Sequence, residues 1–349
     1  MPKTLPGVKR MNPHVKIYLK QVPLLKRLIP YWRKVRQHIG FKNPTTAGWL
    51  ERDQYVGSGY QIISKANFMH DLRTAIERRI SYATGKIGIT AQYMVSYEML
   101  LDTETDKNKI SEFESRLEHA CLKQQGIYPV DNEFYRQYSK FYIDHARNLD
   151  ALGICYYSGE VEILKYYRFT NKLIYYVNQE PERSEKNCYL PYFRDKRLLI
   201  ICPFAGVLKS QATKEIFEGV WSKTGKKWFY PKSVDALEFP YGFSRETHKI
   251  YPTVLELFDD IKDRLHRKDF DVALIAAAGL AIPIASHIKS MGKIAIDLGG
   301  HLQFVFGVLG KRWRDSEDGK RNYYNDWWID MPAKYKPRET DVCDNGAYW

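Results

Sequence analysis

The second half of the chain alternates between short apolar runs and longer stretches in which apolar residues recur every three or four positions. The apolar runs lie at residues 197–202, 271–277 and 293–297. The helical patterns lie at residues 209–222, 252–266 and 280–291. Apolar strands joined by helices of about a dozen residues pair in parallel through crossover connections. This pattern predicts an α/β fold with a Rossmann-like, mostly parallel sheet flanked by helices.

The first half of the chain is richer in helical patterns. Helices are predicted at about 65–80, 107–124 and 132–148, and the last carries an aromatic stripe of Phe134, Tyr138, Phe141 and Tyr142. Strands are predicted within residues 82–90, where the chain runs into a glycine-bearing turn, and at residues 154–157, which end at Ser158-Gly159-Glu160. Prolines and charges over residues 178–194 indicate a boundary between two halves.

Three parts follow from this organisation. We expect a basic amphipathic arm and linker at residues 1–58 and a largely helical α/β half at residues 59–190. We expect the Rossmann-like nucleotide-binding half, with a C-terminal tail, at residues 191–349.

The positive charge of the chain is concentrated at its beginning. The net charge is +13, and residues 1–50 hold eleven Lys or Arg and no acidic residue, so only +2 remains for the rest. Basic and apolar residues alternate there around Pro23 and Pro30, a composition typical of an anionic membrane surface, which we assign to residues 1–42. A helix packed on the domain or a partner-binding extension fits equally well. The prolines and the lack of a known recognition motif argue against nucleic acid as a partner.

The cysteines and the apolar runs indicate where the protein acts. The five cysteines are scattered without a CxxC pair, which argues against a disulfide framework or a structural zinc site. No apolar run reaches the ~18 residues of a spanning helix, and no signal-peptide pattern opens the chain. We therefore expect a cytoplasmic protein, with the arm as a means of peripheral attachment to a membrane.

Polar and glycine residues follow the predicted strands of the second half. The three turns are Pro203-Phe204-Ala205-Gly206, Ala277-Ala278-Gly279 and Asp297-Leu298-Gly299-Gly300-His301. Ligands of open parallel sheets lie beyond such carboxyl ends. Asp297 can accept hydrogen bonds from sugar hydroxyls, and His301 can polarise a phosphate or move a proton. Close packing at Gly279, which lacks a G-x-G-x-x-G pattern, and helix capping by Asp297 and His301 are the plain alternatives.

The order of several short segments resembles a known family. The matching pieces are Gly85-Lys86-Ile87-Gly88-Ile89-Thr90, Ile201-Cys202-Pro203-Phe204-Ala205, Asp271-Val272-Ala273-Leu274-Ile275, Gly299-Gly300-His301-Leu302-Gln303, Phe306-Gly307, Gly310-Lys311-Arg312-Trp313 and Gly346-Ala347-Tyr348-Trp349. The segment from Asp271 to His301 resembles the C-terminal half of GT-D-type glycosyltransferases of bacterial surface polysaccharides. The other pieces, in this order, make the chain from about residue 65 onward resemble proteins of bacterial surface-polysaccharide loci. The resemblance implies transfer of a sugar from a UDP- or GDP-linked donor to a glycan or glycolipid acceptor.

One departure from that family concerns the metal. GT-D enzymes carry an Asp-x-Glu turn that holds a divalent metal and the donor diphosphate, and the acids fall here on Ile89 and Ala91. The turn before Glu160 retains only the Glu. A metal remains conceivable, but its usual ligands are missing, so no metal-binding residue is predicted and cationic side chains with backbone N–H groups are expected to neutralise the leaving diphosphate.

The predicted site residues fall into three groups. Asp297, His301 and Glu160 are the candidate catalytic residues, with a slight preference for Asp297. The candidate donor-binding residues are Lys86, Gly88, Thr90, Pro203, Phe204, Gly279, Gly299, Gly300, Gln303, Lys311 and Arg312. Trp313 and Trp328 are the candidate acceptor-binding residues, because aromatic rings stack on pyranose faces, although core packing explains such residues equally well. The alternatives to a glycosyltransferase are a non-catalytic relative that binds glycan or nucleotide, and another Rossmann-like transferase such as a methyltransferase.

Overall fold

The computed structural model describes residues 52–157, 159–179, 181, 188–339 and 342–349. The compact unit described below is Gln54–Trp349. The amphipathic segment and the membrane contact predicted for residues 1–42 lie outside the described residues. Within the described part of the chain, no helix combines the length and the apolar character needed to cross a membrane.

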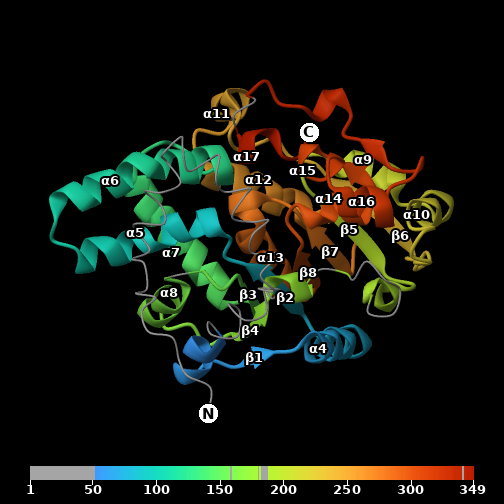
Figure 1. Ribbon diagram of the computed structural model, residues 1–349, viewed down its shortest axis with the longest axis horizontal. Helices are drawn as coiled ribbons and strands as arrows, with labels where there is room; N and C mark the ends of the chain where they lie inside the picture. The colour runs from blue at the N-terminus through green and yellow to red at the C-terminus, as the bar shows by residue number, and fades with distance from the viewer. Residues whose placement is uncertain (1–51, 158, 180, 182–187, 340–341) are drawn as a thin grey trace, which may run out of the picture. The chain divides into compact units, whose positions relative to one another are not determined.

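A single eight-stranded sheet forms the centre of the unit, with the strand order β1-β4-β3-β2-β8-β7-β5-β6 (Figure 1). All of its neighbouring strands pair in parallel. The strands are β1 (Ile62–Ile63), β2 (Tyr82–Lys86), β3 (Ala151–Ile154), β4 (Lys172–Tyr175), β5 (Arg197–Ile201), β6 (Ser233–Leu237), β7 (Val272–Ile275) and β8 (Ile294–Asp297). This sheet confirms the predicted Rossmann-like α/β fold.

The two halves of the chain meet in the middle of this sheet. Residues 59–190 supply β1 to β4, and residues 191–349 supply β5 to β8. They join where β2 pairs with β8, with Thr84 opposite Ile296. In the second half, β5 lies between β6 and β7, so the chain leaves β5 first to one side and later returns to the other. Such a reversal of strand order opens a crevice at the carboxyl ends of the strands.

Helices cover both faces of the sheet, as Figure 1 shows. The longer ones are α4 (Lys65–Arg78), α5 (Ile89–Thr103), α6 (Lys107–Glu118), α7 (Asn132–Arg147), α12 (Val254–His266) and α13 (Ala281–Ser290). The shorter ones are α8 (Glu160–Tyr166), α9 (Ala205–Gln211), α10 (Lys214–Val220), α11 (Arg245–Ile250), α14 (His301–Val305), α15 (Lys311–Arg314), α16 (Glu317–Asn322) and α17 (Cys343–Gly346). A small pair of strands, β9 (Val308–Leu309) and β10 (Ile329–Asp330), completes the C-terminal part.

Alternation along the strands divides the apolar core into two layers. In β5, Leu199 and Ile201 pack in the layer that contains α5, α7, α12 and α13. Leu198 and Ile200 pack in the layer that contains α4, α9, α10 and α14. Because successive side chains of a strand point to opposite faces, a strand covered on both sides reads as a continuous apolar run. This is why the central strands were predictable.

The structure corrects several predicted elements. The strand predicted at residues 154–157 is β3, which ends at Ile154, and the residues after it form a turn in which Tyr156 has a φ of 57°. The helix predicted at residues 209–222 is two helices, because Thr213 caps the start of α10 with its side chain. The helix α5 and the edge strand β6 were not predicted. In α7 the buried aromatic side chains are Tyr135, Tyr138 and Tyr142, and the predicted stripe residues Phe134 and Phe141 are half-buried against the core.

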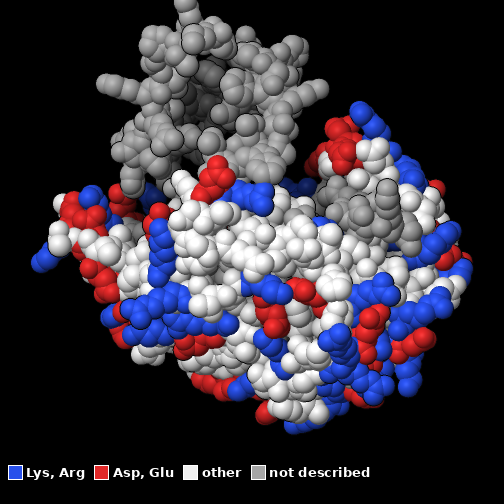
Figure 2. All heavy atoms as spheres, turned by 90° about the horizontal axis from the view of Figure 1, so that it is seen from below, with Lys and Arg blue, Asp and Glu red and all other residues white. Residues whose placement is uncertain are grey.

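The surface of the unit carries charges of both signs. Figure 2 shows basic and acidic side chains intermixed over the face seen from below. The mixture agrees with the near-neutral total charge of the chain after residue 50. On this face, no extended region of one sign suggests a polyanionic partner.

Candidate functional site

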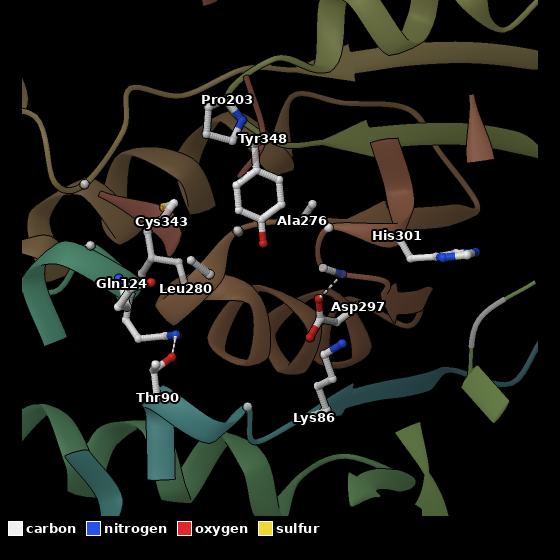
Figure 3. Close-up of a pocket in the computed structure, with 18 of the residues that line it drawn as sticks. Lys86, Thr90, Gln124, Pro203, Ala276, Leu280, Asp297, His301, Cys343 and Tyr348 are labelled. Atoms are coloured by element: carbon white, nitrogen blue, oxygen red, sulfur yellow. Dashed lines mark hydrogen bonds between the residues drawn. The ribbon is translucent and has the colours of Figure 1, made fainter. Parts of the chain in front are cut away.

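A cavity of about 610 Å³ runs along the carboxyl edge of the sheet. Its walls come from the loops that follow every strand of the large sheet except β1, and from the C-terminal residues (Figure 3). It therefore includes the crevice that the reversed strand order around β5 creates. The residues that build it are described below from the centre outward.

Asp297 lies at the middle of the cavity, as the last residue of β8. Its carboxylate accepts a 2.9 Å hydrogen bond from the backbone N–H of Gly299, which has a φ of 52°. Gly85 on the neighbouring strand β2 lies beside it, since a Cβ there would be 3.4 Å from the Cβ of Asp297. Burial raises the pKa of Asp297, while the charge of Lys86 and backbone N–H groups act in the opposite direction.

Lys86 is the last residue of β2, the strand beside β8. Its Nζ lies 4.7 Å from the centre of the Tyr176 ring and 3.7 Å from the position that a Cβ on Gly299 would occupy. Figure 3 shows its side chain directed towards Asp297. A cation and a partly desolvated carboxylate thus share the centre of the cavity.

The start of α5 forms the adjacent wall. Gly88 is the residue that precedes α5. No side chain caps the start of this helix, and the first turn of the helix has no acidic residue. Gly88, Ile89 and Thr90 line the cavity, and the Thr90 hydroxyl accepts a hydrogen bond from the Gln125 side chain. The uncapped N–H groups of a helix start, with the positive end of the helix dipole, favour an anionic ligand.

The turns after β5 and β7 form a less polar wall. Pro203 and Phe204 line it as predicted from their place after a strand, together with Ala276, Ala277 and Ala278. Gly279 is not part of the lining. A Cβ on Gly279 would lie 2.3 Å from Cδ1 of Ile127, so the glycine permits close packing of the chain after α6 against this turn.

His301, the first residue of α14, is on the cavity wall but faces the core. Its ring stacks on that of Phe304, with 5.5 Å between the ring centres, and His301 is 8% exposed. Figure 3 shows the ring turned away from Asp297. Asp297 and His301 thus belong to the same turn, but their side chains do not point towards each other.

Arg312 and Trp313 line the cavity from α15. The Arg312 guanidinium lies 5.1 Å from the centre of the Tyr348 ring, and its Nη1 is 3.3 Å from the position of a Cβ on Gly300. Lys86 and Arg312 therefore lie on the two sides of the Gly299–Gly300 turn. These two cations are brought together although they are 226 positions apart in the sequence.

Glu160 lies outside the cavity lining, at the start of α8. Its carboxylate accepts hydrogen bonds from the Tyr55 hydroxyl, from the Gln92 amide at 3.1 Å and from the backbone N–H groups of Cys155 and Tyr156 at 3.0 Å. Burial raises the pKa of Glu160, and these donors act in the opposite direction. Its contacts fix the turn that follows β3, so the structure gives it a positioning role.

Three further candidates also lie outside the lining. Trp328 is 7% exposed and donates from Nε1 to the Val220 carbonyl at 3.0 Å, within the apolar core. Lys311 is exposed, and its Nζ lies 3.4 Å from the Asn345 carbonyl. Gln303 is fully buried and donates from Nε2 to the Tyr348 carbonyl at 3.0 Å. Core packing is thus the observed role of Trp328.

Sequence reasoning missed several residues of the cavity wall. These are chiefly aromatic residues of the loops after β3, β4 and β6: Tyr157, Tyr176, Tyr241 and Phe243. Their position directly after strands was the available signal, but β4 and β6 were not predicted and β3 was placed too late in the chain. Tyr142, from α7, also lines the cavity, and burial together with the charge of Asp297 raises its pKa.

No metal ligands gather in the described part of the chain. Among these residues there is no group of three or more His, Cys, Asp or Glu side chains that could hold a metal ion.

Comparison of the chain with models of protein families, with curated proteins and with solved structures gives no match.

Proposed function

We propose that the protein is a glycosyltransferase that moves a sugar from a nucleoside-diphosphate donor to a hydroxyl of a glycan or glycolipid. The observation that carries this proposal is the placement of Asp297 between Lys86 and the Gly299–Gly300 turn, with Arg312 on the far side of that turn. A carboxylate that can take a proton and cations that can hold an anion lie within one cavity large enough for a nucleotide sugar.

The charges of the wall suit a diphosphate. Of the described residues that line the cavity, Lys86 and Arg312 carry basic side chains and Asp297 carries the one acidic side chain. The start of α5 adds N–H groups on the side of Lys86. These groups provide the charge stabilisation that a divalent metal supplies in other transferases.

The reaction then needs one base and one anion site. Asp297 accepts the proton of the acceptor hydroxyl as its oxygen forms a bond to the anomeric carbon of the donor. The bond between that carbon and the phosphate oxygen breaks, and its electron pair leaves with the nucleoside diphosphate. Lys86, Arg312 and the α5 N–H groups stabilise the charge that develops on this leaving group.

The aromatic residues of the wall suit the sugars. Tyr157, Tyr176 and Trp313 line the cavity, and aromatic rings pack well on the apolar faces of pyranoses. These rings flank Asp297 on the side of β3 and β4 and on the side of α15.

The experiment is a donor screen with the full chain. UDP- and GDP-linked sugars are incubated with the protein in Mn²⁺ and separately in EDTA, and released nucleoside diphosphate is measured with and without simple glycoside acceptors. The proposal expects release from at least one donor, persisting in EDTA and abolished in Asp297→Asn. Binding without release would instead favour a non-catalytic binding protein. Binding of S-adenosylmethionine, with no response to any nucleotide sugar, would favour a methyltransferase and overturn the proposal.

A further inference from the structure

The C-terminal residues lie against the centre of the cavity and are fixed there by hydrogen bonds. Gln303 of α14 donates to the Tyr348 carbonyl at 3.0 Å. The backbone N–H groups of Lys311 and Arg312 donate to the carbonyls of Trp349 and Ala347, each at 3.0 Å. The segment that carries Tyr348 is thus tied to the same short helices that border the Gly299–Gly300 turn.

Two glycines allow Tyr348 to lie directly on this turn. A Cβ on Gly300 would be 2.6 Å from Cε1 of Tyr348, and a Cβ on Gly310 would be 2.5 Å from its backbone carbon. Any side chain at either position would push the segment away. The ring therefore lies as close to the turn as the backbone permits.

The Tyr348 hydroxyl extends into the cavity, on the side of Asp297 (Figure 3). The Arg312 guanidinium lies 5.1 Å from the ring centre. On the other side, Trp349 packs its ring edge against Tyr241 and Phe243 and donates from Nε1 to the Tyr241 hydroxyl at 3.1 Å. The segment is anchored on both sides of Tyr348.

Gln303 is an unusual residue for this place. It is fully buried, and its Oε1 has no hydrogen-bond partner, although burying such an oxygen costs free energy. Its amide N–H group donates a hydrogen bond to the carbonyl of Tyr348. A buried polar side chain whose amide N–H group donates to the carbonyl of Tyr348 indicates that the position of Tyr348 matters.

We propose that Tyr348 and Arg312 together bind the diphosphate of the donor, and that Gln303 is the positioning residue that holds Tyr348 in place. The inference rests on the proposed function and assigns the leaving-group half of that site. A phenolic O–H donates to a phosphoryl oxygen, and a planar guanidinium binds phosphate oxygens in pairs. The site thus draws its anion-binding groups from β2, from α15 and from the segment that carries Tyr348, all beside the Gly299–Gly300 turn.

Calorimetric titration of the full chain with inorganic pyrophosphate and with UDP and GDP tests this assignment. Tyr348→Phe keeps the ring and removes the hydroxyl, and it should weaken the affinity for pyrophosphate and for the bound nucleotide about tenfold. The matched control is Tyr230→Phe, since Tyr230 is exposed outside the cavity, and its affinities should equal those of the unmodified protein.

Gln303→Leu separates positioning from packing. It should weaken pyrophosphate binding about fivefold and speed amide hydrogen exchange over residues 342–349, while the exchange of the central strands stays unchanged. A purely packing role would change the melting temperature and leave the affinity as it was. That result would remove Gln303 from the assignment.

The outcomes distinguish this inference from the proposed function. If nucleotide binding and donor turnover occur but Tyr348→Phe leaves both affinities unchanged, the inference is overturned and the proposed function stands. If pyrophosphate binds in a Tyr348-dependent way but no nucleotide or nucleotide sugar does, the anion site is supported and the proposed function fails. If neither pyrophosphate nor nucleotide binds, both are overturned.

Discussion

Lys86 and Asp297 end two neighbouring parallel strands, and the Lys86 side chain is directed towards Asp297 in the cavity. Strands β2 and β8 come from different halves of the chain, so this pair exists only because the halves share one sheet. Burial raises the pKa of Asp297 and the charge of Lys86 opposes that shift. The pair thus places an acidic and a basic side chain together at the carboxyl edge of the sheet.

Replacement of Asp297 by Asn should separate activity from stability. Donor turnover should fall about a hundredfold or more, because the base is lost. Since the folded-state pKa of Asp297 is raised, folding is favoured by protonation, and stability falls as pH rises through that pKa. The neutral Asn removes this penalty, so its melting temperature at pH 7 should equal or exceed that of the unmodified protein. A folded Asp297→Asn variant with full turnover would exclude Asp297 as the base.

A half-buried histidine should make the fold sensitive to acid. Burial lowers the pKa of His145 to about 4, with His287 and Lys262 adding to the effect and Asp144 opposing it. Because the unfolded imidazole titrates near 6.5, stability is complete above that pH and falls as pH drops towards 4. We expect a loss of at most about 2 kcal/mol between pH 7 and pH 5, measured by urea unfolding.

The control for this effect is His145→Gln, which should reduce the dependence of unfolding on pH across that window. The Ser286 hydroxyl lies 2.8 Å from Nδ1 of His145, so a polar replacement keeps a partner for it. An unchanged slope in the variant would show that another group causes the acid sensitivity.

Glu160→Gln should lower the stability of the protein more than it lowers the affinity for nucleotide. The Gln side chain cannot accept from all of the donors that the carboxylate serves, among them the backbone N–H groups of Cys155 and Tyr156. We expect a loss of about 1–3 kcal/mol in the free energy of unfolding. Nucleotide affinity should remain within about threefold of the unmodified protein. Unchanged stability with abolished turnover would instead make Glu160 a catalytic residue.

Trp328→Ala should behave as a core substitution. The indole packs against Trp221 and Phe304, and the distances between ring centres are 5.6 Å and 4.9 Å. Its removal should cost about 3–5 kcal/mol of stability. Trp313→Ala, which changes a residue of the cavity wall, should cost less stability and raise the KM for the acceptor. The reverse pattern would restore Trp328 as an acceptor contact.

The sequence was informative where one local pattern decides the structure. The buried strands β5, β7 and β8 are apolar on both faces and read as continuous runs, which also placed Asp297 and Pro203 at strand ends. The edge strand β6 is exposed or half-exposed at all of its residues except Leu237, so it shows no continuous apolar run. Helix α5 begins with β-branched residues and has apolar residues on most of its surface, so no one-faced period was evident.

Contacts between distant segments could not be predicted in this way. The bond from Tyr55 to Glu160 joins residues 105 positions apart, and it turns a candidate base into an anchor of a turn. The hydrogen bond from Nε1 of Trp328 to the carbonyl of Val220 spans 108 positions. The placement of Tyr348 depends on Gln303 and on two glycines of other segments. Such pairings follow from the folded topology and leave no periodic trace in the sequence.

The central claim is that the cavity binds a nucleoside diphosphate beside Asp297, and calorimetric titration with UDP and GDP tests it most directly. The account predicts binding of at least one of them, weakened about tenfold or more in Lys86→Met. Lys109→Met, which removes an exposed cation of α6 paired with Glu104, should leave the affinity unchanged. Absence of binding by either nucleotide, or equal affinities in Lys86→Met and the unmodified protein, would contradict the account.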